Sequence, residues 1–159
     1  MSTPAHLWLT DENDSPIVGG CMMPTRLGSI ELKTLTHNVS IPVDPNYGKL
    51  TGTRVHSPIC VQKEFDQTTP VLFRALCEGR TLKSAIIRMY RITEAGIETE
   101  YFNIELENVK ISSITPSLLP GGVSGTHMEA IELRYENITW KYTDGNILFK
   151  DGWNVRWTA

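Results

Sequence analysis

The sequence has no long hydrophobic run and no cluster of basic residues, and each absence excludes a class of protein. No apolar stretch approaches the roughly 18 to 20 residues of a membrane-spanning helix. The 159 residues hold 15 Lys and Arg against 18 Asp and Glu, a formal net charge of -3, whereas nucleic-acid binding depends on neutralising phosphate groups. We therefore expect neither membrane insertion nor a nucleic-acid partner.

Cysteine is also scarce, because Cys21, Cys60 and Cys77 are the three in the chain and lie far apart. An odd number of cysteines without a Cys-x-x-Cys pair indicates neither a disulfide framework nor a zinc site. Free cysteine is among the most buried residue types, so we expect three reduced and mostly buried thiols. The sequence assigns them no role.

A cleavable secretion signal is missing as well. Residues 1–10 contain no basic segment and no long apolar stretch, and they lead directly into Asp11, Glu12 and Asp14. By itself this predicts a protein that is made in the cytoplasm and stays there, unless it leaves by a route that recognises folded structure.

What the sequence does have is an alternation of apolar and polar residues, which is the pattern of half-buried β-strands. A slip of one residue in this alternation at Glu136 and Asn137 predicts a β-bulge within one long strand. Seven or eight strands with one small helix fit a single-domain β-barrel or sandwich. The expected strands cover residues 5–9, 30–41, 83–92, 97–106, 108–114, 127–142 and 147–149.

One short helix is expected, from about Pro70 to Glu78. Thr69 is a favourable N-cap, Pro70 suits the first helical position and Gly79 is a common terminator. A helix of little more than two turns is marginal by itself, so its apolar stripe must pack on the sheet. The stripe consists of Leu72, Phe73 and Leu76.

Two segments that contain proline and glycine are expected to form long loops. The first runs from Pro42 to Arg54 and the second from Pro116 to Gly125. Long ordered loops in small domains are commonly functional, although the first segment also fits a loop that is merely mobile.

The clearest hairpin joins residues 83–92 to 97–106 through a turn at 94–96. If the apolar residues of both strands share the core face, Arg91 lies opposite Glu98 as a cross-strand ion pair. A bulge at Gly96 would instead shift this register by one residue, and the sequence leaves both arrangements open. The core face would hold Ala85, Ile87, Met89, Phe102, Ile104 and Leu106.

The residues form no catalytic constellation. The four histidines, His6, His37, His56 and His127, occupy separate segments without the spacing of metal ligands, so each is expected at the surface or in packing. The glycines at 121–125 match neither a catalytic-serine turn nor a phosphate-binding loop. We therefore predict no enzyme activity, no metal and no cofactor, and expect a protein that acts through its surfaces.

Several stretches, in this order and spacing, resemble the Hcp family, the haemolysin-coregulated protein of bacterial type VI secretion. The segment Lys-Leu-Thr-Gly-Thr-Arg at 49–54 is similar to the enterobacterial branch of that family. Together they cover nearly the whole chain. The stretches are residues 28–32, 37–39, 48–54, 63–66 with 69–70, 101–103, 129–140, 144–146 and 152–154.

The resemblance implies a β-barrel of two antiparallel sheets with one short helix, and a homohexameric ring. Rings would stack into a tube inside a contractile sheath on a baseplate, be expelled with the VgrG spike, and carry small effector proteins in the lumen. It also implies export of folded protein from the cytoplasm without a signal peptide. The chain ends a few residues after Trp153, so we expect a single domain over 1–159 without a fused effector.

The resemblance also suggests two sets of contact residues. Tyr47, Lys49, Thr51 and Arg54 of the long loop would contact the neighbouring ring. Thr34 and Thr36 lie in a segment similar to the one that lines the lumen, so they would face cargo.

The alternative from another class is a monomeric carbohydrate- or ligand-binding β-sandwich. Its stacking platform would be built from Trp8, Trp140, Trp153 and Trp157. Tryptophans so far apart in sequence are more typical of cores and interfaces.

Overall fold

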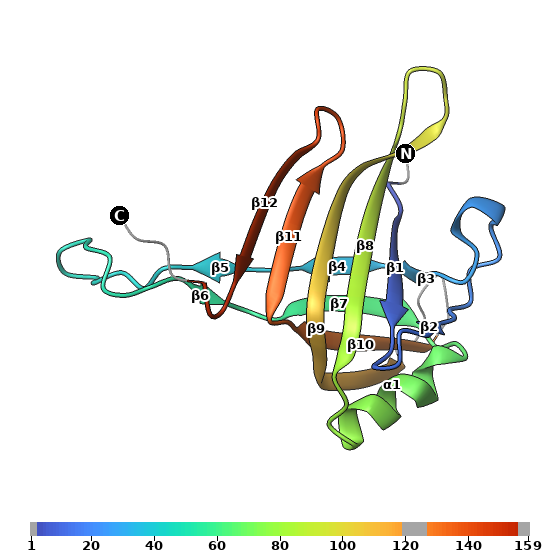
Figure 1. Ribbon diagram of the computed structural model, residues 1–159, viewed down its shortest axis with the longest axis horizontal. Coiled ribbons are helices and arrows are strands. Elements are labelled where there is room, and N and C mark those ends of the chain that lie inside the picture. The colour runs from blue at the N-terminus through green and yellow to red at the C-terminus, as the bar shows by residue number, and fades with distance from the viewer. Residues whose placement is uncertain (1–2, 119–126, 156–159) are drawn as a thin grey trace.

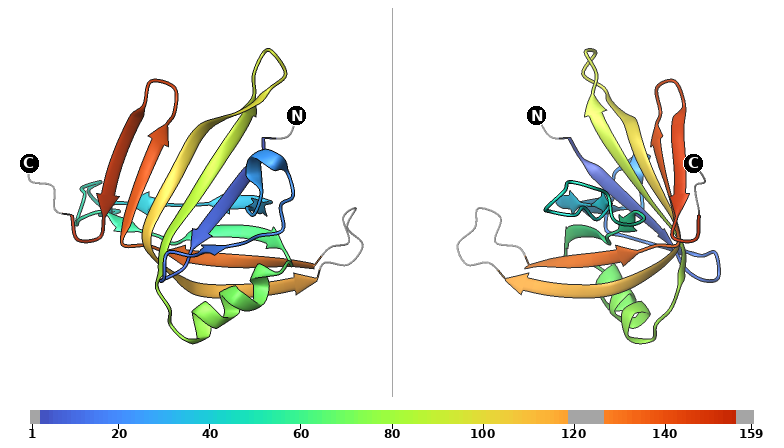
Figure 2. Two further views of the ribbon diagram at one scale, coloured as in Figure 1. Left: turned by 45° about the vertical axis from the view of Figure 1, so that its right-hand side comes forward. Right: turned by 90° about the vertical axis from the view of Figure 1, so that its left-hand side faces the viewer.

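The chain folds into two crossing antiparallel β-sheets with one α-helix beneath them (Figures 1 and 2). The computed structural model describes residues 3–118 and 127–155. The mostly β fold with one short α-helix, predicted from the alternation, is confirmed. The strands are β1 (Ala5–Thr10), β2 (Pro16–Ile17), β3 (Ile30–Leu32), β4 (Thr34–Thr36), β5 (Val39–Ser40), β6 (Val55–His56), β7 (Ile59–Glu64), β8 (Leu82–Ile92), β9 (Glu98–Leu118), β10 (His127–Arg134), β11 (Asn137–Tyr142) and β12 (Ile147–Gly152).

Strand β9 belongs to both sheets. Its first half pairs with β8 and β11, and residues 110–118 pair with β10. The first sheet therefore runs β2-β1-β8-β9-β11-β12, with β3 also paired to β1, and the second runs β9-β10-β7-β4. Asn108, between the two halves, has a positive φ of 53°, a conformation that asparagine tolerates better than most residues. The predicted break between residues 106 and 108 is thus wrong, because one strand continues from sheet to sheet.

Two further long strands of the prediction are divided between the sheets. The β-bulge predicted at Glu136 in the segment 127–142 is wrong. The chain instead leaves the second sheet after Arg134 and enters the first at Asn137. Likewise, 30–41 breaks into β3 on the first sheet, β4 on the second and β5 on a small two-stranded sheet with β6. In both segments, the alternation of apolar and polar residues shifts by one position where the chain passes from one sheet to another. Of the second predicted loop, residues 116–118 are part of β9 and residues 119–126 lie outside the described ranges.

The β8–β9 hairpin has the predicted core face, but its core pairs, Ala85 with Leu106 and Ile87 with Ile104, lie two residues from the register in which Arg91 faces Glu98. A shift between Met89 and Tyr90 then places Arg91 opposite Thr99. Near the turn the register is therefore offset by one residue from the Arg91–Glu98 pairing, as the second arrangement left open by the sequence allows. Glu98 instead forms an ion pair with the buried Arg26. Arg26 closes a short 3-10 helix (Pro24–Arg26) and also stacks on the Tyr90 ring, with 3.8 Å from Cζ to the ring centroid.

The helix α1 (Thr68–Cys77) begins two residues before the predicted start. The predicted N-cap Thr69 lies inside the helix, and the carboxylate of Asp66 accepts a hydrogen bond from the Thr68 backbone N–H at 2.9 Å. Gly79 follows the end with a φ of 65°, as expected for a glycine terminator. Leu72 and Ala75 are buried where α1 packs against β9.

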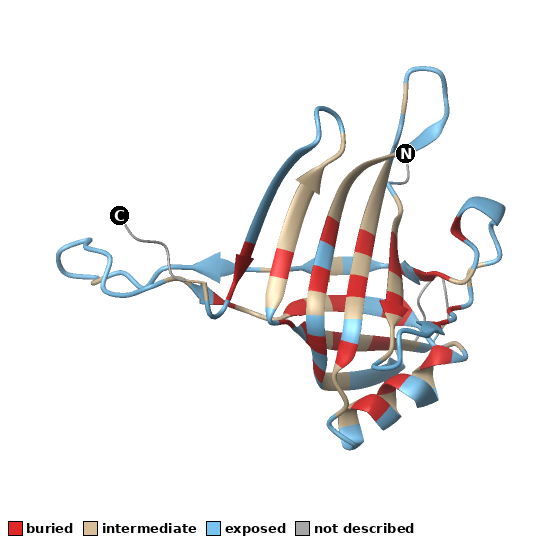
Figure 3. Cartoon of the chain, viewed as in Figure 1, coloured by how far each residue is buried: buried red, intermediate tan, exposed pale blue. Residues whose placement is uncertain are grey.

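The apolar core lies between the sheets and above α1, along the middle of the strands (Figure 3). None of the three cysteines is buried, since Cys21 and Cys60 are half-buried and Cys77 is exposed, so the prediction of mostly buried thiols is wrong. Within residues 3–118 and 127–155, no helix has the length and apolar character needed to cross a bilayer.

Candidate functional site

The long loop between β5 and β6 forms a projecting arm, residues 41–54, at one end of the molecule (Figure 1). Backbone hydrogen bonds fold it back on itself, from Asp44 N to Lys49 O at 2.7 Å and from Thr51 N to Pro42 O at 2.8 Å. Gly48 supplies the positive φ of 67° at the tip. The arm is therefore a hairpin-like element and not a structureless loop.

Three of the four predicted ring-contact residues lie exposed on this arm. Tyr47 is 78% exposed, and Lys49 and Thr51 are also exposed. Val43 and Leu50, which form an isolated bridge across the arm, add exposed apolar surface. An exposed tyrosine among apolar residues is typical of contact surfaces.

The fourth predicted residue, Arg54, is occupied within the chain. Its guanidinium donates to both carboxylate oxygens of Asp151 on β12, at 2.5 and 2.6 Å, and to the carbonyl oxygens of Gly152 and Val155 at 3.1 and 2.6 Å. Such bidentate pairs fix the orientation of both partners. Arg54 therefore ties the base of the arm to β12.

A chain of polar side chains continues from this ion pair into the protein. Asp151 also accepts from His56 Nε2 at 2.8 Å, and the Tyr135 hydroxyl lies 2.6 Å from His56 Nδ1 and 2.8 Å from His37 Nε2. His56 and Asp151 are buried. We call Arg54, Asp151, His56, Tyr135 and His37 the anchor cluster. Burial, and secondarily Asp151, raise the pKa of Tyr135, so its hydroxyl keeps its proton.

Thr34 and Thr36, the predicted cargo residues, lie exposed on β4 at the edge of the second sheet. Thr34 is opposite Gln62 and Thr36 is opposite Cys60, and the pairing continues over β10 and β9. Next to β4, the outward face of this sheet consists of mostly uncharged side chains, which we call the polar face. The same outward face continues on either side to the charged residues Glu64, Lys110 and Arg134. The polar face consists of Thr34, Thr36, Cys60, Gln62, Ala130, Glu132, Ser113 and Thr115.

A buried ionic network under the polar face was not foreseen. Lys63 and Glu129, both 0% exposed, are cross-strand partners and form an ion pair. Lys63 Nζ also donates to Asp66 Oδ1 at 3.0 Å, and Thr69 Oγ1 donates to Glu129 Oε1 at 3.0 Å. The network thereby joins the two central strands to the start of α1. The sequence did contain a sign of this burial, because Lys63 and Glu129 both stand at positions of their strands that the alternation assigns to the core.

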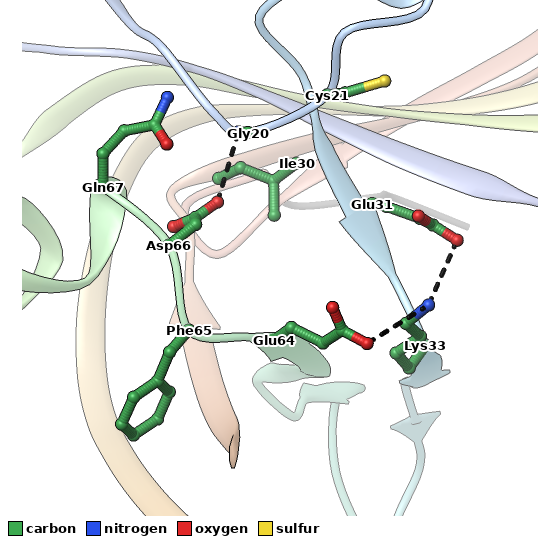
Figure 4. A pocket seen from close by; sticks show the side chains of 9 residues that line it. All are labelled: Gly20, Cys21, Ile30, Glu31, Lys33, Glu64, Phe65, Asp66 and Gln67. Carbon is green, nitrogen blue, oxygen red and sulfur yellow. Dashed lines mark hydrogen bonds and ion pairs between the residues drawn. The ribbon is translucent and has the colours of Figure 1, made fainter. Parts of the chain in front are cut away.

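A hollow of about 350 Å³ lies beside this region (Figure 4). Its charged side chains are already paired, since Lys33 Nζ lies 3.3 Å from Glu31 and 3.7 Å from Glu64. Asp66 accepts from the Gly20 N–H at 3.3 Å. The hollow therefore offers no set of converging free groups.

The tryptophans of the alternative do not form one platform. Trp8 pairs in register with the outward-facing Ile86, whereas Trp140 pairs with the buried Ile104, so the two rings lie on opposite faces of the first sheet. Trp153 borders His56 at 5.7 Å between ring centroids, and Trp157 lies outside the described residues.

Comparison with known proteins gives one consistent result. The family model for the type VI secretion system effector Hcp matches residues 6–142. The "Major exported protein" of Pseudomonas aeruginosa is 31% identical, with 96% of each chain covered. A doubly substituted Hcp1 protein from E. coli EAEC 042 is 46% identical with a TM-score of 0.89, covering 96% of this chain and 99% of its own. The secreted protein Hcp3 of P. aeruginosa is 26% identical with a TM-score of 0.79, over 97% and 100%.

Proposed function

Because this chain belongs to the Hcp family of type VI secretion proteins, we propose that it is the subunit of a secreted tube. Six copies close into a ring, and rings stack end to end inside a contractile sheath on its baseplate. Contraction expels the tube with its VgrG spike, and small effectors travel in the lumen. The role is structural rather than enzymatic, and the protein passes from the cytoplasm to the exterior in a folded state.

The observation that best supports a ring is the pair of unpaired edges on the second sheet. Within the described residues, β4 pairs with β7 alone and residues 110–118 of β9 pair with β10 alone. Unpaired edges favour association with another strand, and a cyclic arrangement uses two different surfaces of each subunit.

The strand directions are also compatible with closure. The order β9-β10-β7-β4 is antiparallel at every step, so β4 runs antiparallel to β9. Placing β4 of one copy beside β9 of the next continues the same alternation. The polar faces of all copies then form one continuous inner wall, which puts Thr34 and Thr36 next to cargo.

The ring is tested by mass spectrometry under native conditions together with negative-stain microscopy. We expect a particle of six chains and ring-shaped projections at micromolar concentration. A monomer at every concentration, with a mass shift on adding oligosaccharides, would favour the carbohydrate-binding alternative and overturn the proposal.

The polar face is tested by the double substitution Thr34→Arg with Thr36→Arg. Both residues are exposed, so we expect rings of unchanged mass. Twelve added arginines in each ring should obstruct the lumen. The amount of small proteins that co-purifies with rings from cells with an active secretion system should therefore fall about tenfold or more, which corresponds to about 1.4 kcal/mol of binding free energy.

The matched control is Thr25→Arg with Thr99→Arg, which adds the same charge at exposed positions outside the polar face. It should retain cargo at the wild-type level. Equal cargo retention by both double variants would refute the assignment of the polar face.

A further inference from the structure

The anchor cluster holds two histidines in series between the arm and the body of the protein. We propose that it is a proton-operated latch, which holds the arm against β12 while the histidines are neutral and releases it when both become protonated. The inference rests on the proposed role of the arm in ring stacking, to which it adds regulation by pH.

In the neutral state each of the three side-chain hydrogen bonds that link Asp151, His56, Tyr135 and His37 can be assigned one donor and one acceptor. Asp151, ion-paired with Arg54, can only accept, so His56 carries its proton on Nε2 and donates it to Asp151. His56 Nδ1 then accepts from the Tyr135 hydroxyl, and the oxygen of Tyr135 accepts from His37 Nε2–H. This assignment follows from the acceptor-only carboxylate at one end of the chain.

One additional proton can be accommodated. Protonated His56 donates from Nδ1 to the Tyr135 oxygen, and the hydroxyl turns to a His37 that has moved its own proton to Nδ1. A second proton has no such solution, because both rings then donate to the same oxygen and the Tyr135 hydroxyl loses its acceptor.

The charges also oppose double protonation. Two imidazolium rings, whose centroids lie 5.7 and 5.4 Å from that of Tyr135, would then face the same hydroxyl, and Asp151 is already ion-paired with the Arg54 guanidinium. The other rings against His56, those of Trp140 and Trp153, are uncharged. Like charges in a partly buried site repel strongly. Tyr135 cannot compensate by ionising, since burial and Asp151 raise its pKa.

The sign of the pH dependence follows from His37. Burial, and then the neighbouring His56, hold the pKa of His37 below its ordinary value of 6.5, against an opposing backbone hydrogen bond at Ser57. The latched state therefore binds fewer protons than the released state. Its stability is complete above about pH 6.5 and falls below it, by at most about tenfold per pH unit for each proton taken up.

The arm is the element that yields. Apart from the side-chain contacts of the anchor cluster, the base of the arm is held by a two-stranded sheet of two residue pairs, Val39 with His56 and Ser40 with Val55, and by a hydrogen bond from Ser57 N to Asn38 O at 2.9 Å. The arm itself is mostly exposed. Segments with few buried contacts open locally at the lowest free energy.

The test is hydrogen exchange of the full-length protein, followed by mass spectrometry of peptides from the arm and from β8. Between about pH 7.5 and about pH 5.5, corrected for the intrinsic exchange rate, we expect protection of residues 42–54 to fall about tenfold or more. Protection of β8 (82–92) should change less than about twofold, since most of this strand is paired with β1 on one side and with β9 on the other.

Two histidine variants separate the latch from a general effect of acid. His37→Gln keeps a donor to Tyr135 but cannot be protonated, so the fall in arm protection should largely disappear. His127→Gln removes an exposed histidine that stacks on Phe65, outside the cluster, and should behave as the wild type. His56→Gln is a second, more buried replacement with the same expectation as His37→Gln.

An arm protection that is independent of pH in the wild type, or one that falls equally in the His37→Gln protein, would overturn the latch. Tube length by microscopy on the same samples keeps the two proposals distinguishable. If tubes form at pH 7.5 but the exchange protection of the arm does not depend on pH, the latch proposal is refuted and the proposed function stands. If the arm opens at low pH but no tubes form at any pH, the latch proposal is supported and the proposed role of the arm in ring stacking is refuted.

Discussion

Replacing residues 43–50 by an Asn-Gly turn is expected to leave hexameric rings intact and to abolish their stacking. The ends of the excised segment are adjacent, because Thr51 N donates to Pro42 O at 2.8 Å, so a two-residue turn can close the gap. The variant keeps Arg54 and its contacts with Asp151, and thereby the base of the arm. Any loss of stacking then reports on the tip alone.

A point substitution gives the same answer with less disturbance. Exposed tyrosines at interfaces commonly contribute more than 1 kcal/mol, so Tyr47→Ser should raise the concentration needed for stacking about tenfold. Met22→Ser is the matched control, since Met22 is 83% exposed against 78% for Tyr47 but lies away from the arm. Sedimentation and electron microscopy measure ring mass and tube length. Normal tubes from the shortened protein would show that the arm has no part in stacking.

The largest expected loss of stability comes from Lys63→Met. The substitution leaves the carboxylate of Glu129 fully buried without its cation, and an uncompensated buried charge costs about 3–5 kcal/mol of unfolding free energy. Asp66, which caps the start of α1, loses its hydrogen bond from Lys63 at the same time. Urea unfolding at one fixed protein concentration measures the change, because assembly also contributes to apparent stability.

Two companion variants identify the cause. Lys63→Met with Glu129→Leu removes both charges and should recover most of the loss, as buried ion pairs replaced by apolar residues commonly do. Lys33→Met breaks exposed pairs with Glu31 and Glu64 and should cost about 0–1 kcal/mol. A loss below about 1 kcal/mol for Lys63→Met would mean that the buried pair does not stabilise the fold.

The arm illustrates how far a functional surface can be anticipated. Its position between two strands follows from local composition, and the exposure of Tyr47, Lys49 and Thr51 agrees with that pattern. The ion pair that holds Arg54 within the chain could not be predicted from local composition, because its partner Asp151 is 97 residues away in the sequence. Nothing in the local sequence around residue 54 distinguishes an anchor from a contact residue.

The ionic network shows a similar division. Lys63 follows Ile59 and Val61 in phase, and Glu129 precedes Ile131 and Leu133, so alternation alone places both charges inside. That they face each other depends on the register of β7 against β10. Register is set by non-local pairing, which a single strand pattern does not specify.

The sequence by itself determined the β class, the short helix, the arm and the core face of the β8–β9 hairpin, because each depends on residues close together in the chain. Only the tertiary structure decided where strands change sheet, at Lys33, Asn108 and the Tyr135–Glu136 step. The same changes of sheet bring His37, His56, Tyr135 and Asp151 together. The physical reason is that a change of sheet is stabilised by partners distant in sequence, whereas alternation records only which side of its own strand a residue occupies.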